Sequence, residues 1–398
     1  MSIVLPSLPT AKSSGFVPAQ SDNATLTQDW LAQLLASADI HLNGTRAWDI
    51  QINHPQMLKR LLKHGGLGLG DSYMDGWWEC QAIDLMLERA MTARLHEKLQ
   101  TPRAWWESFK GHLRPSDSEG PSRIVGRMHY QVGNAVYQAM FDPYMTHSCA
   151  YWVDGAQTLE EAQLANLEMI CRKLQLKPGM RVLDLGCGWG SFMRYATERY
   201  GVSVLGLTHS EEQLKLGQQL ARSKPMQFEL TDYRQFNPDS KSRFDRIVSI
   251  GLFDQLGQKD FSAFFQTAKR SLKDDGWMLL QTQGKSPNSG LLDAWDDKHI
   301  HAPGYVPRLD EVTQASEAHF VVEDVHNFGA DYDRTLQHWH QRFEMAWPQL
   351  RLSHDERFYR MWRFHLLSSA ASFRTRHKQM WQLVLSPKGL HKVYRRNY

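Results

Sequence analysis

The sequence predicts an α/β fold in which a largely parallel sheet follows a smaller helical N-terminal domain. From residue 181 onward, short apolar segments alternate with amphipathic helical segments, a pattern typical of a right-handed parallel sheet. The first of these strands leads directly into a glycine-rich turn and then a helix. Upstream of residue 115, in contrast, apolar residues recur at helical spacing. These observations predict two domains, with a ligand-binding loop in the second.

The composition is that of a globular protein without a membrane-spanning segment. A chain of 398 residues with 42% hydrophobic content can bury the cores of two domains. No stretch reaches the ~18 consecutive apolar residues needed to cross a bilayer, and Met1 to Asn23 lacks the basic start and apolar run of a signal peptide. The cysteines show no paired metal spacing and predict a reduced, cytoplasmic protein without a metal site; they are Cys80, Cys149, Cys171 and Cys187.

Charge is unevenly distributed along the chain, although the formal net charge is only +3. No acidic residue follows Glu356, whereas ten lysines and arginines do. Such a basic segment predicts an anionic partner, either a membrane surface or a nucleic acid.

The N-terminal domain is expected to span residues 26–114, after a flexible lead-in over residues 1–25. Helical periodicity begins near Trp30, and Met57–His64 has the pattern of a short basic amphipathic helix that Gly65 and Gly66 end. We expect a loop rich in glycine and aromatic residues from there to Trp78, with its rings forming a small core.

Basic and aromatic side chains alternate over residues 91–114. A helix that lies on anionic lipid uses such a face, but a solvated helix with a buried aromatic seam has the same pattern. Both interpretations stay open. The polar segment 115–122 is rich in residues that break helices and strands and predicts a linker, which places the domain boundary there.

The second domain is expected to span residues 123–398. Thr158 and Glu161 have capping-box spacing and predict the start of a helix that Pro178 ends. Strands are predicted at residues 181–185, 202–207, 226–230, 244–250 and 277–282, with a late strand near 381–385. The intervening segment, about 285–380, contains two apparent helices and is expected to cover the carboxyl edge of the sheet and form the substrate pocket.

The most informative stretch is Arg181-Val-Leu-Asp-Leu-Gly-Cys-Gly-Trp-Gly-Ser191. Open parallel sheets bind ligands at the carboxyl ends of their strands, and glycines let backbone N–H groups approach the ligand. The spacing is not that of the dinucleotide fingerprint G-x-G-x-x-G, because the third glycine comes one residue early. It is similar to the first motif of S-adenosylmethionine (AdoMet) dependent methyltransferases.

Four further motifs make the chain resemble the family of cyclopropane-fatty-acyl-phospholipid synthases and mycolic-acid cyclopropane synthases; they are Gly68–Glu79, His129–Asn134, Met140–Trp152 and His326–Asp333. The resemblance implies a Rossmann-like, AdoMet-dependent methyltransferase domain and a helical N-terminal domain for lipid binding and dimerisation. It also implies a homodimer, peripheral at the inner face of the cytoplasmic membrane, that acts on unsaturated phospholipid and not on nucleic acid.

In that family the AdoMet methyl is transferred to a cis double bond of an acyl chain, and the resulting carbocation loses a proton to close a cyclopropane ring. A bound bicarbonate is thought to take that proton. An alkene is a poor nucleophile, so the site must hold it at near-attack distance. Water must be excluded because it would trap the cation, and aromatic faces can stabilise positive charge.

The resemblance places the AdoMet contacts at the ends of the strands. The glycine turn and the aspartate before it hold the cofactor, residues after the second strand reach the ribose, and residues after the third reach the adenine. A further pair closes over the cofactor. In chain order the implied residues are His147, Ser148, Asp184, Gly186, Gly188, Gly190, Thr208, Gln213, Asp232 and Tyr233.

The family's proton-abstraction cup is matched only in part. Cys149 and Tyr332 match, whereas a Glu-His pair reads Asp254-Gln255 and the H-T-I-G motif reads Gln-Thr-Gln-Gly at residues 281–284. A carboxylate withdrawn by one methylene weakens a hydrogen-bonded bicarbonate site, and a glutamine cannot carry the proton that a histidine can. The backbone N–H at Gln283 is retained. The implied catalytic residues are Cys149, Asp254, Gln281, Gln283 and Tyr332.

Three interpretations stay open for the function. The leading one is a cyclopropane-fatty-acyl-phospholipid synthase with a weakened cup. The second is a related lipid C-methyltransferase that gives branched chains, and the third is a catalytically impaired paralogue that binds lipid or AdoMet. Whether bicarbonate is used is left undecided by the altered cup.

Overall fold

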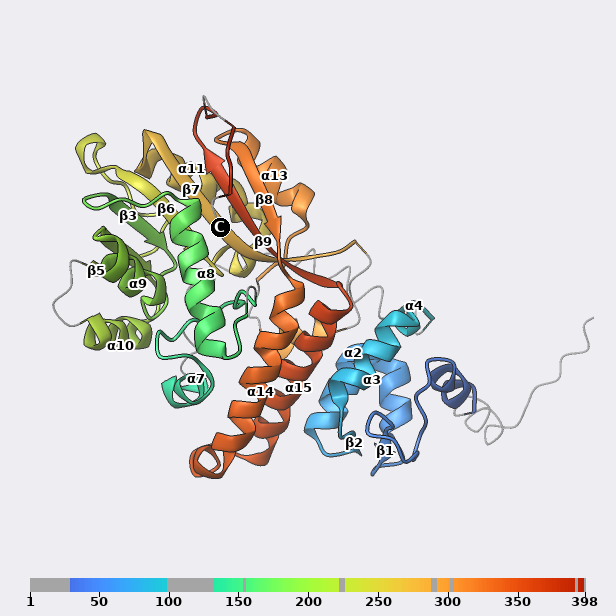
Figure 1. Ribbon diagram of the computed structural model, residues 1–398. Helices are drawn as coiled ribbons and strands as arrows, with labels where there is room; N and C mark the ends of the chain where they lie inside the picture. Colours follow the sequence, from blue (N-terminus) through green and yellow to red (C-terminus); the bar gives the residue numbers. More distant parts are fainter. Residues whose placement is uncertain are drawn as a thin grey trace, which may run out of the picture.

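A computed structural model describes residues 29–98, 132–152, 155–221, 226–287, 292–300, 304–390 and 393–396. A seven-stranded sheet with the order β5-β4-β3-β6-β7-β9-β8 lies at its centre (Figure 1), which confirms the predicted α/β fold. The strands are β3 (Arg181–Leu185), β4 (Ser203–Thr208), β5 (Met226–Leu230), β6 (Phe244–Ile250), β7 (Leu272–Lys285), β8 (Val321–Asn327) and β9 (Lys378–Ser386).

The sheet is parallel from β5 through β7, after which β9 runs in the opposite direction and β8 in the original one. β9 pairs antiparallel with β7, and β8 pairs antiparallel with β9 at the sheet edge. The five predicted parallel strands and the late strand are confirmed, but β8 was not predicted. Its sequence gives a weak strand signal because the strand is only partly buried and its pairing is shifted between Val322 and Asp324.

Helices cover both faces of the sheet. α8 and α9 contribute apolar residues to the core on one face, and α11 and α13 contribute to the core on the other. At the start of α8, Thr158 and Glu161 form the predicted capping box. These helices and the neighbouring α10 are α8 (Leu159–Lys173), α9 (Ser191–Tyr200), α10 (Glu211–Ala221), α11 (Phe261–Ser271) and α13 (Leu309–Glu317).

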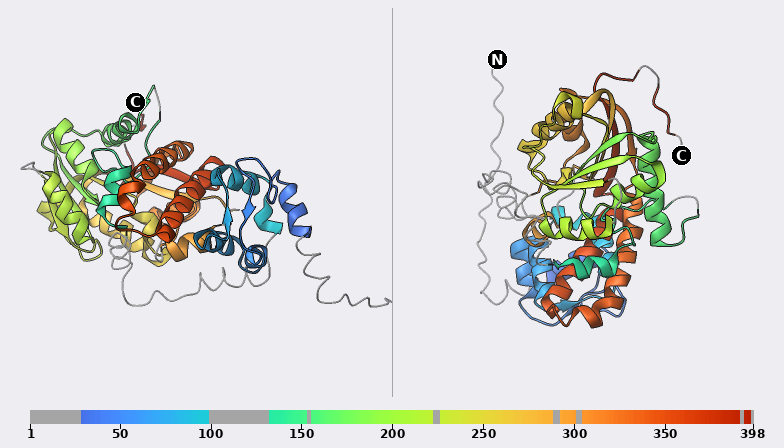
Figure 2. Two further views of the ribbon diagram at one scale, coloured as in Figure 1. Left: turned by 90° about the horizontal axis from the view of Figure 1, so that it is seen from below. Right: turned by 90° about the vertical axis from the view of Figure 1, so that its left-hand side faces the viewer.

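A second group of helices lies below the sheet in the view of Figure 1. α14 and α15 form an antiparallel hairpin, and α15 packs against α2 and α3 of the N-terminal region (Figures 1 and 2). This group comprises α2 (Met57–Met74), α3 (Ile83–Thr92), α4 (Leu95–Lys98), α7 (Asn134–Met140), α12 (Asp293–His299), α14 (Ala330–Leu350) and α15 (Glu356–Arg374). The short elements are β1 (Gln51–Ile52), β2 (Trp78–Glu79), η1 (Ser240–Ser242), η2 (Phe253–Gln255) and η3 (Gln258–Asp260).

The predicted end of the basic helix at Gly65 is confirmed, but a second helix follows where a loop was expected. Gly65 has the non-helical torsions φ 55° and ψ −135°, and the chain turns there before helix resumes and runs to Met74. Glycine tolerates this kink because it lacks a Cβ. The expected loop is therefore mostly helical, while Tyr73 and Trp78 are buried in the core as expected.

One apolar cluster runs from Leu31 to Met380 and joins the N-terminal helices to α14 and α15. The segment between β7 and β9 contains α12, α13, β8, α14 and α15 rather than the two helices expected from the sequence. The predicted lead-in, the linker 115–122 and most of the basic aromatic segment 91–114 lie outside the described residues. In the part of the chain that is described, no helix is long and apolar enough to span a bilayer.

The basic run after Glu356 is not the free cationic surface that its sequence indicates. Seven of its cations form ion pairs with acidic residues of other elements. The pairs are Arg357–Asp75, Arg360–Glu79, Arg363–Glu344, Arg374–Asp84, Lys378–Asp296, Lys388–Asp274 and Arg396–Asp324.

Candidate active site

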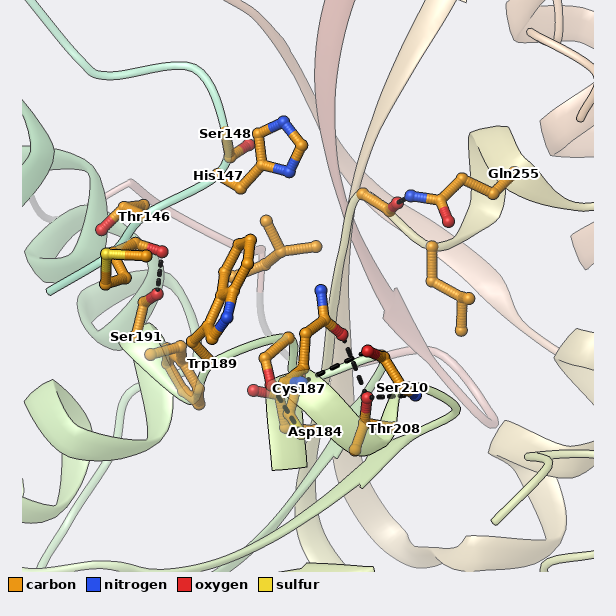
Figure 3. Close-up of a pocket in the computed structure, with 18 of the residues that line it drawn as sticks. Thr146, His147, Ser148, Asp184, Cys187, Trp189, Ser191, Thr208, Ser210 and Gln255 are labelled. Carbon is orange, nitrogen blue, oxygen red and sulfur yellow. Dashed lines mark hydrogen bonds between the residues drawn. The ribbon is translucent and has the colours of Figure 1, made fainter. Parts of the chain in front are cut away.

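A pocket opens at the carboxyl ends of β3, β4 and β6 (Figure 3). The chain runs outward from β3 to β5 and then returns to the other side of β3 as β6, so the pocket lies at the switch point of the sheet. The pocket is open to solvent at its mouth. Of the predicted cofactor residues it is lined by His147, Ser148, Asp184, Gly186, Gly188, Thr208 and Gln213.

The glycine turn forms the floor of the pocket. Gly188 has φ 54°, and a Cβ built there would meet only Gln213 Nε2, at 4.0 Å. The space above Gly188 therefore belongs to the pocket, where a side chain would compete with a ligand. Gly190 has a different role, because a Cβ there would lie 2.5 Å from Phe228 Cζ. It permits close packing at the start of α9 and does not line the pocket.

Polar side chains at the ends of β3 and β4 face the same space. Asp184 is 2% exposed, burial raises its pKa to about 8, and its Oδ1 has no partner among the described residues. Thr208 Oγ1 donates to Gln213 Oε1 at 3.1 Å and accepts from the Ser210 N–H at 3.2 Å. These contacts fix an array of hydroxyl and amide groups beside a buried carboxyl.

The opposite wall is aromatic. The exposed His147 ring stacks on Phe141 with centroids 5.0 Å apart, and Trp339 lies 5.7 Å away. Trp189 projects from the glycine turn below His147 in Figure 3, and its indole N–H donates to Asn134 Oδ1 at 3.1 Å. Trp189 was not among the predicted site residues, although its place inside the glycine turn was a usable signal.

Two predicted cofactor residues, Asp232 and Tyr233, do not line this pocket. Burial favours a higher pKa for Asp232, but hydrogen bonds from Arg234 outweigh it and lower the pKa. The Tyr233 ring packs against Phe264 in the core of the other sheet face, with centroids 5.7 Å apart. His209, which lies close enough to Asp232 to lower its pKa, does line the pocket, as does Ser210; neither was among the predicted site residues.

Three of the predicted catalytic residues are buried near the pocket. Cys149 and Asp254 directly adjoin the lining residues Ser148 and Gln255 in sequence, and Tyr332 lies within electrostatic range of both, while burial raises the pKa of its hydroxyl. Burial also raises the pKa of Asp254 to about 6, against hydrogen bonds from Thr282 and the backbone N–H of Gln283. Gln255, the neighbour of Asp254, lines the pocket itself.

Gln281 has a different set of partners. Its Nε2 donates to Ser148 Oγ at 2.6 Å, and its Oε1 accepts from Gln382 Nε2 at 2.6 Å. Both ends of the amide are thus engaged away from Asp254 and Tyr332. The backbone N–H of Gln283 donates to the Asp254 carboxylate.

The sequence model of the family described as mycolic acid cyclopropane synthetase matches residues 118–383. The chain belongs to this family. A cyclopropane-fatty-acyl-phospholipid synthase of Escherichia coli is 44% identical over 361 residues, which cover 89% of this chain and 92% of the relative. Membership of the cyclopropane synthetase family confirms the resemblance seen in the sequence.

Solved structures agree with this assignment. A cyclopropane synthase from Mycobacterium tuberculosis superposes with a TM-score of 0.63 at 29% identity and covers 68% of this chain and 99% of that one. A mycolic acid cyclopropane synthase complexed with SAH (S-adenosylhomocysteine) and CTAB gives a TM-score of 0.61 at 31% identity, covering 65% and 96%. Both are shorter than this chain, and residues 29–98 lie outside the family match.

Proposed function

We propose that the protein is a cyclopropane-fatty-acyl-phospholipid synthase, an AdoMet-dependent enzyme that methylates the cis double bond of an unsaturated phospholipid acyl chain and closes a cyclopropane ring. The observation that carries the proposal is the nearly full-length similarity to the Escherichia coli enzyme. The juxtaposition of a glycine-floored pocket with a buried Cys149, Asp254 and Tyr332 cluster supports it.

The pocket fits AdoMet. The open space above Gly188 would be filled by a Cβ, and Asp184 offers a buried carboxyl oxygen without a partner among the described residues. When bound, AdoMet supplies an electrophilic methyl group on a sulfonium centre. Gly188 lets the backbone approach the cofactor, Gly186 permits close packing against Leu252, and Thr208 and Gln213 present fixed hydrogen-bonding groups. Ser148 and His147 bound the site from the other side.

The aromatic wall would keep water from the reacting alkene. Trp189, Phe141 and Trp339 pack around His147, and Tyr332 packs edge-on against Trp339 with centroids 5.8 Å apart. A water molecule reaching the carbocation would give an alcohol, so exclusion protects the product. The π faces of the rings can stabilise the cation by ~0.5 to 2 kcal/mol each.

Bicarbonate fits this cup poorly. Gln281 stands where the family has a histidine, but its amide is fully engaged with Ser148 and Gln382. Asp254 is ionised above pH about 6 and can then accept a proton itself. We therefore assign the proton that leaves the carbocation to the Asp254 carboxylate, with Tyr332 and Cys149 as neighbouring walls. Gln283 supports this carboxylate through its backbone N–H.

The engagement of Gln281 also favours a second candidate, a lipid C-methyltransferase with a branched product. A cup in which Gln281 replaces the histidine of the family has lost one proton carrier and removes the ring-closing proton less efficiently, so the cation can lose a different proton and leave a methylene branch. The two products differ because a cyclopropane adds one CH₂ and removes the alkene, whereas a methylene branch keeps an alkene.

The proposal extends to the setting of the enzyme. Residues 26–114 form a domain for lipid binding and dimerisation, residues 115–122 a linker, and residues 123–398 the catalytic domain. The protein acts as a homodimer at the inner face of the cytoplasmic membrane and does not act on nucleic acid. The family resemblance and the basic aromatic pattern of residues 91–114 support this part of the proposal.

One experiment tests the function directly. Purified protein is incubated with labelled AdoMet and vesicles of anionic unsaturated phospholipid, and the released fatty acids are analysed by mass spectrometry before and after hydrogenation. A product that carries one added CH₂ and takes up no hydrogen at the former double bond supports the synthase. A product that still takes up hydrogen supports the branched alternative. RNA is offered in a parallel reaction, and label in RNA but not in lipid would refute both.

A further inference from the structure

A buried row of side-chain amides joins the middle of the sheet to the wall of the pocket. Gln281 on β7 and Gln382 on β9 are cross-strand partners in the antiparallel ladder. α8 packs over them and contributes Gln163 and Asn166, one turn apart. All four residues are 0% exposed. We call this set the amide row.

The amide row holds Ser148 at two points. Gln281 Nε2 donates to Ser148 Oγ at 2.6 Å, and Gln163 Nε2 donates to the Ser148 carbonyl at 2.9 Å. Gln281 is in turn fixed by Gln382, whose Nε2 donates to Gln281 Oε1 at 2.6 Å and to Asn166 Oδ1 at 3.3 Å. Ser148, which lines the pocket, is thus positioned by groups from β7 and α8.

The amide row does not give the most stable packing of this part of the core. Three of its atoms, Gln163 Oε1, Asn166 Nδ2 and Gln382 Oε1, have no hydrogen-bond partner among the described residues. A buried polar atom without a partner destabilises the folded state, whereas apolar side chains of similar volume would avoid that cost. Positioning of Ser148 therefore explains the presence of these buried amides better than a contribution to stability does.

The hydrogen bond from Gln281 fixes the direction of the Ser148 hydroxyl. Because Oγ accepts on the side of Gln281, its own proton is directed elsewhere, and the open space beside Ser148 is the pocket. We propose that Gln382 is a positioning residue, which acts through Gln281 to aim the Ser148 O–H at an acceptor atom of the bound cofactor. The inference rests on the proposed function only in naming AdoMet as the ligand.

The test uses the full-length protein and SAH as the probe, with binding measured by calorimetry in the absence of lipid. Gln382→Met keeps the volume of the side chain but removes its hydrogen bonds. We expect the Kd for SAH and the KM for AdoMet to rise about tenfold, as for loss of one oriented hydrogen bond, with a smaller change in kcat. Gln379→Met is the matched control, because Gln379 lies on the opposite face of β9 and bonds Asn327 and Ser286.

A double-mutant cycle with Ser148→Ala decides whether Gln382 acts through Ser148. In that background, Gln382→Met should change the Kd for SAH less than about twofold. An equal loss with and without Ser148, or a lowered melting temperature with unchanged Kd, would overturn the inference. If Gln382→Met does not fold, Gln281→Met tests the same path, because it removes the hydrogen bond to Ser148 Oγ directly. SAH binding is independent of lipid chemistry, so absence of a cyclopropane product would refute the proposed function and leave this result unaffected.

Discussion

Replacing Asp254 by asparagine should stabilise the protein while abolishing ring closure. The carboxyl is 6% exposed, and burial raises its pKa from 3.8 to about 6. The folded state thus holds this proton more tightly than the unfolded state, and stability falls as pH rises from 3.8 to about 6. At about 1.4 kcal/mol per pH unit, the full difference is up to about 3 kcal/mol above pH 6.

Urea unfolding at a series of pH values measures this difference. Asp254→Asn should exceed the wild type by up to about 3 kcal/mol near pH 7.5, and the gap should close toward pH 4, where the wild-type carboxyl is protonated. In the lipid assay, wild-type turnover should fall about tenfold per pH unit below pH about 6, because the base must be ionised. The variant should give no cyclopropane at any pH.

Asp274→Asn is the control for a change of charge alone. Asp274 is an exposed carboxylate whose pKa is lowered by a hydrogen bond from Lys388. The substitution should bring no gain in stability at neutral pH. A gain from Asp254→Asn that is the same at pH 4 and pH 7.5, or full cyclopropane formation by that variant, would refute the assignment of Asp254 as a buried base.

Three further predictions concern the cofactor floor, a buried lysine and a helix start. Gly188→Ala should lower SAH affinity at least about tenfold. Gly179→Ala also places a side chain at positive φ but outside the pocket, and should leave the affinity unchanged. Calorimetric titration with SAH measures both affinities. Lys173 is 1% exposed, and burial lowers its pKa from 10.5 to about 7. Between pH 7 and 10 the unfolded state binds this proton more tightly, so the free energy of unfolding of the wild type should rise with pH. Urea unfolding of Lys173→Met should show no such rise. Thr158→Ala should cost about 1 kcal/mol in thermal unfolding by removing the α8 cap, while Thr158→Ser should cost far less.

Local signals account for what the sequence predicted well. The strand, turn and helix around Asp184 follow from apolar runs and glycine spacing within about a dozen residues, and the capping box at Thr158 spans only four. Such signals do not depend on how distant segments pack. The pocket at the switch point of the sheet follows from them together with the general behaviour of parallel sheets.

The positions that sequence reasoning could not place depend on distant partners. Gln281 faces Gln382 because of the register between β7 and β9, which are separated in sequence by the whole helical insertion. Tyr233 was placed correctly at a strand end, but its ring lies in the core because Phe264 offers an apolar neighbour. The basic run after Glu356 indicated a free cationic surface for the same reason. Its acidic partners lie far upstream in the sequence, as Asp75 does for Arg357.

The arginines of α15 bear on whether the catalytic portion can exist alone. Arg360 donates to the carbonyls of Tyr73 and Trp78, and Arg374 binds Asp84 and Glu88. The family match begins at residue 118. A fragment that begins there would leave these guanidinium groups without their partners on a newly exposed apolar surface. Deletion of the residues before 118 is therefore expected to yield insoluble protein, unless Arg360 and Arg374 are also replaced.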